Sequence, residues 1–272
     1  MNQLIRQTLQ PEHNETVDTA RALVPAVDRA MRILALMESM PQECFTVSDI
    51  ARNLGIPKST TFNICGALAE GQLLRRSRDG FKLGRRLVQL GSAYVSSINI
   101  VREFYDVSRM APMDLQATIQ MGALDEDFHV VYLAHQDCNS GLRLGLGGGI
   151  GRRVPANCSA CGKALLANLR PQELERRLDD TPQLPKLTRK SITSRARLMK
   201  VIAETREQGY ATDDEETLNG LCCVAATLPT SCVDGGFVAV SISAAKDTLT
   251  DERAKTIRSV LDRIVDELRL RL

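Results

Sequence analysis

After the mostly polar residues 1–23, apolar residues recur every three or four positions up to about residue 70. This is the spacing of amphipathic helices. Pro41 ends the first of these helices, and Ser48 is a credible N-cap for the second, which Gly55 closes. The third ends at Gly71, where a left-handed C-cap residue is expected. The pattern predicts three helices, over about residues 26–40, 48–54 and 58–70.

A hairpin is predicted directly after the third helix. Residues 73–76 and 81–84 form two short strands around a turn that contains Asp79-Gly80. Helix, helix, turn, helix and hairpin is the order of a winged helix-turn-helix, and we expect one over residues 24–84.

One long helix is predicted next, over residues 85–104, with an apolar stripe along one side. The stripe consists of Leu87, Leu90, Tyr94, Ile98 and Val101. Such a stripe packs either against a second copy of the chain or against its own domain, and the spacing alone does not decide between them.

The remaining residues, 105–272, mix strands and helices, which predicts an α+β domain. Strands are expected over about residues 117–124, 129–135, 210–212, 221–228 and 236–243. Helices are expected over about 161–169, 172–178, 195–208 and 251–270, the last with Thr250 as its N-cap. The glycine-rich residues 145–151 are expected to form a loop.

Composition supports two ordinary globular domains. A length of 272 residues, with 43% hydrophobic and 25% charged residues, is typical of them. Residues 1–23 lack periodicity and are predicted to be a disordered arm without a signal peptide. No apolar run is long enough to span a bilayer, so we expect a cytoplasmic protein that has no membrane partner and keeps its eight cysteines reduced.

Positive charge is concentrated around the predicted hairpin. Between Arg75 and Arg86, six basic residues accompany a single acid, Asp79. A cluster of this kind is either a contact surface for nucleic acid or simply a solvated surface.

Several stretches, in order along the chain, resemble the IclR family of bacterial transcriptional regulators. In the first part these are VPAVDRAMRILALM (24–37), DIARNLGIPKSTTFNICGALAEGQLL (49–74) and FKLGRRLVQLGSAYV (81–95). In the second part they are VVYLAHQD (130–137), ANCSACGKALLA (156–167), EQGYATDDEE (207–216), GLCCVAA (220–226) and AVSISAA (239–245).

The resemblance implies a winged helix, a linker and dimerisation helix over residues 85–104, and a GAF-like α/β effector-binding domain over 105–272. It also implies homodimers or homotetramers, a DNA operator, and a small-molecule effector, often an organic acid, rather than a cofactor. The chain departs from the family at Phe62 and Asn63, where a basic residue or histidine is common. It also departs at Asn157, often a histidine, and at Cys158 and Cys161, where small residues are usual.

DNA contacts are expected from the third helix and the hairpin. The helix enters the major groove, where Asn63 pairs with adenine and Phe62 touches a thymine methyl group, while the hairpin arginines meet the backbone. The structural alternatives are that Ser59 caps the helix and that Phe62 packs on the hairpin. The predicted DNA-binding residues are Lys58, Ser59, Thr60, Phe62, Asn63, Arg75, Arg76 and Arg78.

The resemblance also brings together a predicted effector site. The backbone N–H groups at the start of the helix near residue 160 would bind a carboxylate, opposite two serines that lie two apart on one strand and so share a face. Leu144 and Leu146 would add an apolar wall. The predicted residues are Ala160, Cys161, Gly162, Asp213, Cys223, Ser241 and Ser243.

Two other classes of function are alternatives to a regulator that binds an organic acid. An enzyme is disfavoured because the chain has three histidines and no nucleophile, phosphate-loop or zinc-protease motif, and the acidic run at 213–216 is expected to be solvated. The alternative regulator is a zinc or thiol-redox sensor that uses Cys158, Cys161 and Cys223, although the adjacent Cys222 and Cys223 should point to opposite sides of a strand. No metal site is predicted.

Overall fold

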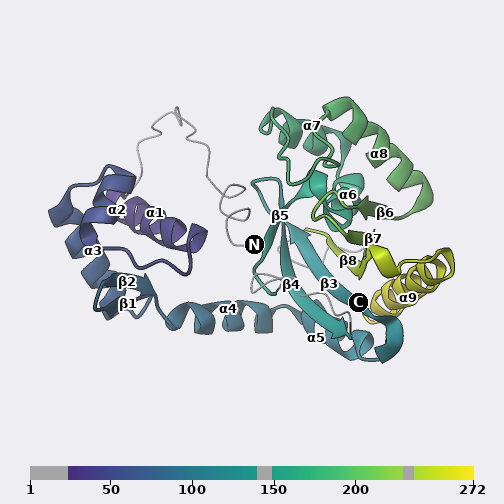
Figure 1. The fold of residues 1–272 in the computed structure, drawn as a ribbon, viewed down its shortest axis with the longest axis horizontal. Coiled ribbons are helices and arrows are strands. Elements are labelled where there is room, and N and C mark those ends of the chain that lie inside the picture. The colour runs from purple at the N-terminus through teal and green to yellow at the C-terminus, as the bar shows by residue number, and fades with distance from the viewer. Residues whose placement is uncertain (1–23, 140–148, 229–235) are drawn as a thin grey trace. The chain divides into compact units, whose positions relative to one another are not determined.

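The computed structural model describes residues 24–139, 149–228 and 236–272 (Figure 1). The chain divides into two compact units between Tyr94 and Val95, inside the predicted linker helix. The predictions for the arm (1–23), for Leu144 and Leu146, and for most of the glycine-rich loop lie outside the described residues.

The first unit is the predicted helix-turn-helix with its hairpin. Its elements are α1 (Pro25–Ser39), α2 (Val47–Leu54), α3 (Lys58–Glu70), β1 (Leu74–Ser77) and β2 (Gly80–Leu83). All five elements contribute side chains to a single core, together with Phe45 from the loop before α2. The core consists of Ile33, Met37, Phe45, Ile50, Cys65, Leu68, Leu74 and Phe81. The predicted element order of this domain is confirmed.

Two helix caps differ from their predictions. Thr46, not Ser48, is the N-cap of α2, because its side chain accepts from the Asp49 N–H while the Asp49 carboxylate accepts from the Thr46 N–H. Gly71 has φ −71°, so it is not left-handed; the positive φ of 58° falls on the next residue, Gln72.

The hairpin is hydrogen-bonded to the loop before α2, and Gly80 lies where the two backbones approach closely. Phe45 and Phe81 exchange backbone hydrogen bonds of 3.0 and 2.8 Å. This close approach excludes a side chain at Gly80, whose φ is +138° and where an added Cβ would lie 2.3 Å from the Phe45 carbonyl oxygen. Glycine is required here by the packing and the backbone conformation together.

The prediction of one helix over 85–104 is wrong, because two helices occupy this stretch. They are α4 (Arg86–Ser97) and α5 (Asn99–Ser108), separated by Ile98 in an extended conformation (φ −98°, ψ 102°). The break allows α5 to bury Ile100, Val101 and Phe104 in the second unit. The predicted stripe is therefore divided: Ile98 and Val101 are buried there, while Leu90 and Tyr94 are exposed on α4.

The second unit is built on a six-stranded sheet with the order β5-β4-β3-β8-β7-β6, in which every neighbouring pair is antiparallel. The strands are β3 (Ala117–Leu124), β4 (His129–Cys138), β5 (Arg153–Pro155), β6 (Ala211–Asp214), β7 (Leu221–Thr227) and β8 (Val238–Ala245). The helices besides α5 are α6 (Ala160–Asn168), α7 (Pro171–Asp179), α8 (Arg195–Gln208) and α9 (Asp251–Leu270). The α+β prediction is confirmed.

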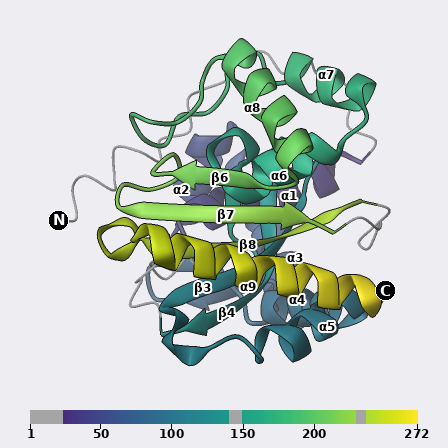
Figure 2. The ribbon, with the colours of Figure 1, turned by 90° about the vertical axis from the view of Figure 1, so that its right-hand side faces the viewer.

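The two faces of this sheet are covered differently. Alternate strand residues such as Val240 and Ile242 pack against α5 and α9, and Figure 2 shows α9 lying along β7 and β8. The residues between them face α6, which covers part of that side through Cys161 and Leu165. On the α6 side, the strands carry buried polar side chains.

None of the described helices is both long and apolar enough to cross a membrane.

Candidate functional site

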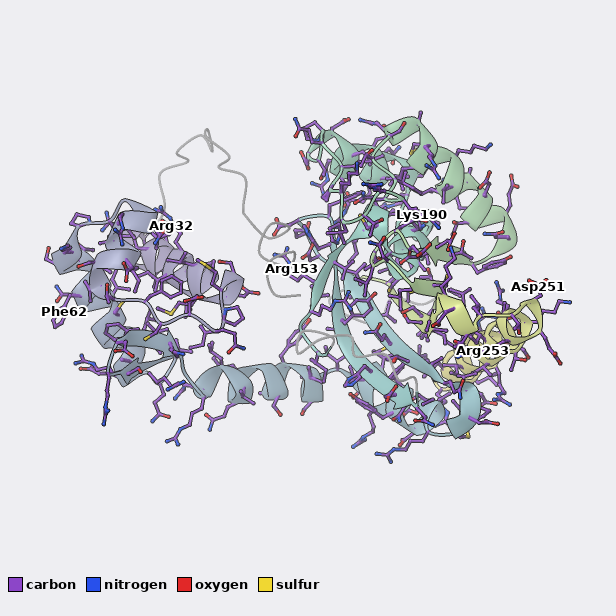
Figure 3. The ribbon with its side chains drawn as sticks, viewed as in Figure 1. Arg32, Phe62, Arg153, Lys190, Asp251 and Arg253 are labelled. Carbon is purple, nitrogen blue, oxygen red and sulfur yellow. The ribbon has the colours of Figure 1, made fainter. Side chains whose placement is uncertain are left out.

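The outer face of α3 carries the predicted DNA-reading residues. Lys58, Ser59, Phe62 and Asn63 are exposed and Thr60 is half-buried. No side chain caps the helix, whose N-cap is Pro57, so the capping role considered for Ser59 is wrong. Phe62 is 55% exposed and lies on the outer surface of α3 (Figure 3), so the alternative that it packs on the hairpin is wrong as well.

The hairpin presents its arginines to solvent. Arg75, Arg76 and Arg78 are exposed, and the Arg76 guanidinium carbon lies 5.8 Å from the centre of the Phe81 ring. No carboxylate of the described residues forms an ion pair with any of the three. Their charge is therefore available to an anionic partner such as a phosphate backbone.

The sheet of the second unit brings four predicted effector residues onto its α6 side. Asp213 pairs with Cys223 across β6 and β7, and Cys223 pairs with Ser243 across β7 and β8. The Cys223 Sγ and Ser243 Oγ atoms are 3.1 Å apart. Ser241 lies two residues from Ser243 on β8, so both serines share the face, as predicted. We call these four residues the polar row.

Two oxygen atoms of the polar row have no hydrogen-bond partner although they are buried. The Asp213 carboxylate accepts from the Glu216 N–H at 2.6 Å through Oδ1, whereas Oδ2 is unpartnered, as is Ser241 Oγ. The two residues are 1% and 2% exposed. A buried polar atom left without a partner costs about 1–3 kcal/mol, so this face is suited to a ligand that supplies the missing hydrogen bonds.

The start of α6 is less open than predicted. Ala160, Cys161 and Gly162 are all buried, and the Gly162 N–H donates to the Ser159 Oγ at 3.0 Å. Ser159 thus caps the helix, and the prediction that the Gly162 N–H is free for an anion is wrong.

Cys158 and Cys161 are buried thiols, and Cys222 and Cys223 are half-buried. The Cys158 thiol donates a hydrogen bond to the Pro185 carbonyl, and the Cys161 thiol donates one to the Ala239 carbonyl. Burial raises the pKa of Cys161 to about 12. Cys222 faces the α9 side, opposite Cys223, as expected for neighbours on a strand, and it contacts Asp214. This arrangement gives no support to the zinc or redox alternative.

The acidic run at 213–216 is not the solvated cluster that was expected. Asp213 is buried, and Glu216 is mostly buried and accepts a 2.6 Å ion pair from Lys163, whose side chain is 1% exposed. Burial raises the pKa of both carboxyl groups, and the Lys163 charge opposes this rise. Sequence periodicity gave no sign of a buried lysine on α6.

Two further residues of this face were missed. Tyr132 on β4 is buried in the cluster that contains Cys161 and borders Cys223, and the Arg152 guanidinium carbon lies 5.8 Å from the centre of its ring. Burial raises the pKa of Tyr132 well above its usual value; Cys161, Cys223 and Asp213 add to the rise, and the Arg152 charge opposes it. Tyr132 therefore lies beside Arg152 and in a cluster that packs against Cys223, the cross-strand partner of Asp213.

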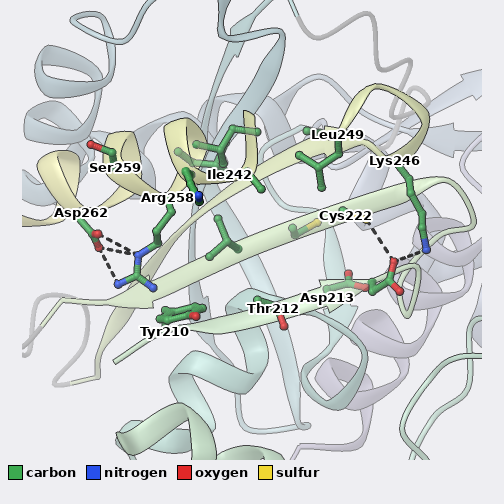
Figure 4. A pocket seen from close by; sticks show the side chains of 17 residues that line it. Tyr210, Thr212, Asp213, Cys222, Ile242, Lys246, Leu249, Arg258, Ser259 and Asp262 are labelled. Carbon is green, nitrogen blue, oxygen red and sulfur yellow. Dashed lines mark hydrogen bonds and ion pairs between the residues drawn. The ribbon is translucent and has the colours of Figure 1, made fainter. Parts of the chain in front are cut away.

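A groove of about 810 Å³ runs beside α9, β6 and β7 (Figure 4). Its apolar lining includes Val224 and Ile242, which point away from the α6 side. At one end Arg258 is stacked over Tyr210, with 3.7 Å between the guanidinium carbon and the ring centre, and is paired with Asp262. No pattern in the sequence predicts this groove.

Both units match models of one family. Residues 26–78 match the IclR helix-turn-helix domain, and residues 92–269 match the C-terminal domain of the bacterial transcriptional regulator IclR.

Curated relatives include the regulator XynR of Escherichia coli, 33% identical over 75% of this chain and 79% of its own. The repressor IclR of Escherichia coli is 26% identical over 92% of this chain and 91% of its own. Among solved structures, an IclR homologue from Microbacterium hydrocarbonoxydans complexed with 4-hydroxybenzoate has a TM-score of 0.69 at 21% identity, covering 90% of this chain and 99% of that one.

These matches cover both domains, and the curated relatives are DNA-binding transcriptional regulators, not enzymes. The helix-turn-helix and the α/β domain are accordingly a DNA-binding domain and a ligand-binding domain. The chain belongs to the IclR family of bacterial transcriptional regulators.

Proposed function

We propose that a small organic acid, bound at the polar row beside the start of α6, controls the affinity of this regulator for its operator. The observation that carries the proposal is the pair of buried, unpartnered oxygens, Asp213 Oδ2 and Ser241 Oγ. A hydroxyl or amide group placed there removes a desolvation penalty that the protein alone leaves uncompensated. A cytoplasmic catabolic acid, aromatic or aliphatic, fits this role.

The neighbour complexed with 4-hydroxybenzoate supports an acid as the effector class. To act as a switch, the acid must bind one conformation of the regulator more tightly than the other, because equal affinity for both shifts no population.

The test begins with the full-length protein and random duplex DNA, from which an operator is selected by binding. Fluorescence anisotropy then measures the affinity for this operator while organic acids are titrated. The proposal requires at least one acid that changes the operator affinity without changing the affinity for unrelated DNA. If no acid does so, the effector role is wrong, although the DNA-binding role stands on its own measurement.

Asn63 and Arg78 are expected to contribute to DNA binding in different ways. Asn63→Ala should relax the preference at one base position, because a bidentate contact with a base is worth about 1–3 kcal/mol of discrimination. Arg78→Ala should weaken binding to all sequences alike and lower the salt dependence by about one unit of slope. Lys200→Ala, the same loss of charge at an exposed position on α8, is the control and should change neither. A position-specific effect of Arg78→Ala would reverse the two roles.

The chain is proposed to act as a homodimer or homotetramer, because a reader of two symmetric half-sites needs two copies. The supporting feature is α4, which contains no buried residue and exposes Leu90 (51%) and Tyr94 (45%), four residues apart and so on one face. An apolar helix face in water is typical of a surface that a second copy covers.

Replacing Leu90 and Tyr94 together by glutamate is expected to lower the oligomer mass, because two charges would be buried in the proposed interface. Light scattering at micromolar concentration measures the mass. Gln89→Glu, a new charge at the exposed position next to Leu90, is the control and should leave the mass unchanged. A wild-type monomer under these conditions would show that the chain does not self-associate.

A further inference from the structure

Arg152 faces the same side of the sheet as the polar row. The Tyr132 N–H donates to the Arg152 carbonyl at 3.0 Å, and the strand that begins at Arg153 continues this pairing. Because strand side chains alternate, Arg152 shares a face with Val154, which is buried in the cluster on the α6 side. Arg153 points the other way and pairs with Asp125 at 2.6 Å and Asp127 at 2.9 Å.

The Arg152 guanidinium has an aromatic partner but no anionic one. It lies over the ring of Tyr132, and no carboxylate of the described residues is within ion-pair distance of it. The neighbouring Arg153 is paired with two carboxylates. Of these two adjacent arginines, only Arg152 lacks an ion pair with a described residue. A half-buried guanidinium without a counter-ion is suited to bind a carboxylate with two parallel hydrogen bonds.

Asp213 has the opposite requirement. Its buried Oδ2 lacks a donor, and its carboxylate would repel an anionic group placed beside it. Tyr132 links the two groups: the Arg152 guanidinium carbon lies 5.8 Å from its ring centre, and its cluster also packs against Cys223, the cross-strand neighbour of Asp213. The face therefore presents a site for a hydrogen-bond donor and a site for an anion, with an aromatic side chain between them.

We infer that the effector is a hydroxycarboxylic acid whose carboxylate binds Arg152 and whose hydroxyl donates to Asp213 Oδ2, so that Arg152 is a specificity-determining residue of the ligand site. This inference rests on the proposed function, because it places the effector at the polar row. Tyr132 contacts the carbon skeleton between the two groups. Ser241 Oγ, also unpartnered, is available to the hydroxyl as a second hydrogen-bonding atom.

The experiment measures the binding of two matched sets of probes to the full-length protein by calorimetry. The first set is 4-hydroxybenzoate, benzoate and 4-hydroxybenzamide, and the second is lactate, propionate and lactamide. In each set the second compound lacks the hydroxyl and the third lacks the carboxylate. One of the two hydroxy acids should bind at least 10-fold more tightly than both of its analogues, as expected for the loss of a charge-assisted hydrogen bond, which weakens binding about 10- to 100-fold.

Three variants assign the two contacts. Arg152→Gln should abolish the preference for the acid over the amide. Asp213→Asn should reduce the preference for the hydroxy acid over the deoxy acid, because an amide binds a hydroxyl more weakly than a carboxylate does. Arg153→Gln is the matched control, because it removes the adjacent arginine on the opposite side, and it should retain both preferences.

The inference is overturned if neither hydroxy acid binds, if the deoxy acids bind equally well, or if Arg152→Gln retains its preference for the acid. Benzoate or propionate that binds as tightly as its hydroxy acid and shifts operator affinity would overturn the inference and leave the proposed function intact. Failure of every acid to change operator affinity would remove the proposed function itself.

Discussion

Lys163→Met is expected to lower the free energy of unfolding of the C-terminal unit by about 3–5 kcal/mol, the usual cost of removing one partner from a buried ion pair. The Lys163 ammonium lies 2.6 Å from Glu216 Oε1, and the two side chains are 1% and 13% exposed. Without Lys163, Glu216 would keep a mostly buried charge without its ion-pair partner, and its Oε2 already lacks a hydrogen-bond partner. The nearby Asp213 carboxylate would lose the same compensating charge.

The loss of stability should depend on pH. Burial raises the folded-state pKa of Glu216, and Lys163 opposes the rise, so removing Lys163 raises this pKa further. A carboxyl group with a raised folded-state pKa binds a proton more readily in the folded than in the unfolded protein. The loss of stability caused by the buried Glu216 carboxylate is therefore smallest below the pKa of Glu216 in the unfolded protein. It is complete above the pKa of Glu216 in the folded protein. The variant should lose less stability at about pH 5 than at about pH 8.

Urea unfolding of the wild type and the variants measures these effects. The double variant Lys163→Met with Glu216→Gln should recover part of the loss, because the remaining group is neutral. Arg195→Ala breaks exposed ion pairs with Glu175 and Asp179 and should change the unfolding midpoint little. If Lys163→Met and Arg195→Ala lower the free energy of unfolding equally, burial does not determine how much the ion pair contributes to stability.

Elements encoded by local signals were predicted well from the sequence. The helix over 251–270 has its predicted bounds and its predicted cap, since the Thr250 Oγ1 accepts from the Arg253 N–H. The α3 bounds are also confirmed. The hairpin forms as predicted, but each strand lies one residue nearer the turn, so that Gly80 belongs to β2. For the two helices the determining interactions lie within about one helical turn in the sequence, whereas Gly80 of the hairpin also meets Phe45, which is distant in the sequence.

Features that depend on distant contacts could not be predicted in this way. No proline or glycine in the sequence marks the break at Ile98. The break occurs because α5 packs into the core of the second unit. Ser241 and Ser243 share a face through strand alternation, which the sequence shows. The packing of Cys223 against the cluster that contains Tyr132 depends instead on a strand order that brings residues about 90 positions apart together. Arg152 and Arg153 look alike in sequence, and only the pairing of β5 with β4 separates their roles.

Gly162 was singled out in the sequence as an anion-binding position, but its main constraint is packing. The 3₁₀ turn over Ala156–Cys158 folds back against the first turn of α6, and a Cβ added at Gly162 would lie 2.3 Å from the Ala156 carbonyl oxygen and 2.4 Å from its Cα. Both atoms belong to the backbone, so rotation of a side chain cannot relieve the contact. The structure must separate the turn from the helix, which also disturbs the start of α6 beside the polar row.

Gly162→Ala is therefore expected to lower the free energy of unfolding of the C-terminal unit by about 3 kcal/mol or more, the upper end of the cost of overpacking. Gly66→Ala is the matched control, because Gly66 also lies within a helix and an added Cβ there meets no atom within 4 Å. That change should stabilise α3 by about 0.5–1 kcal/mol, since alanine restricts the unfolded chain more than glycine does. Urea unfolding followed by separate probes of the two units distinguishes the effects. Gly162→Ala with wild-type stability would mean that the turn at Ala156 moves freely away from α6, and the packing reason for glycine at this position would then be wrong.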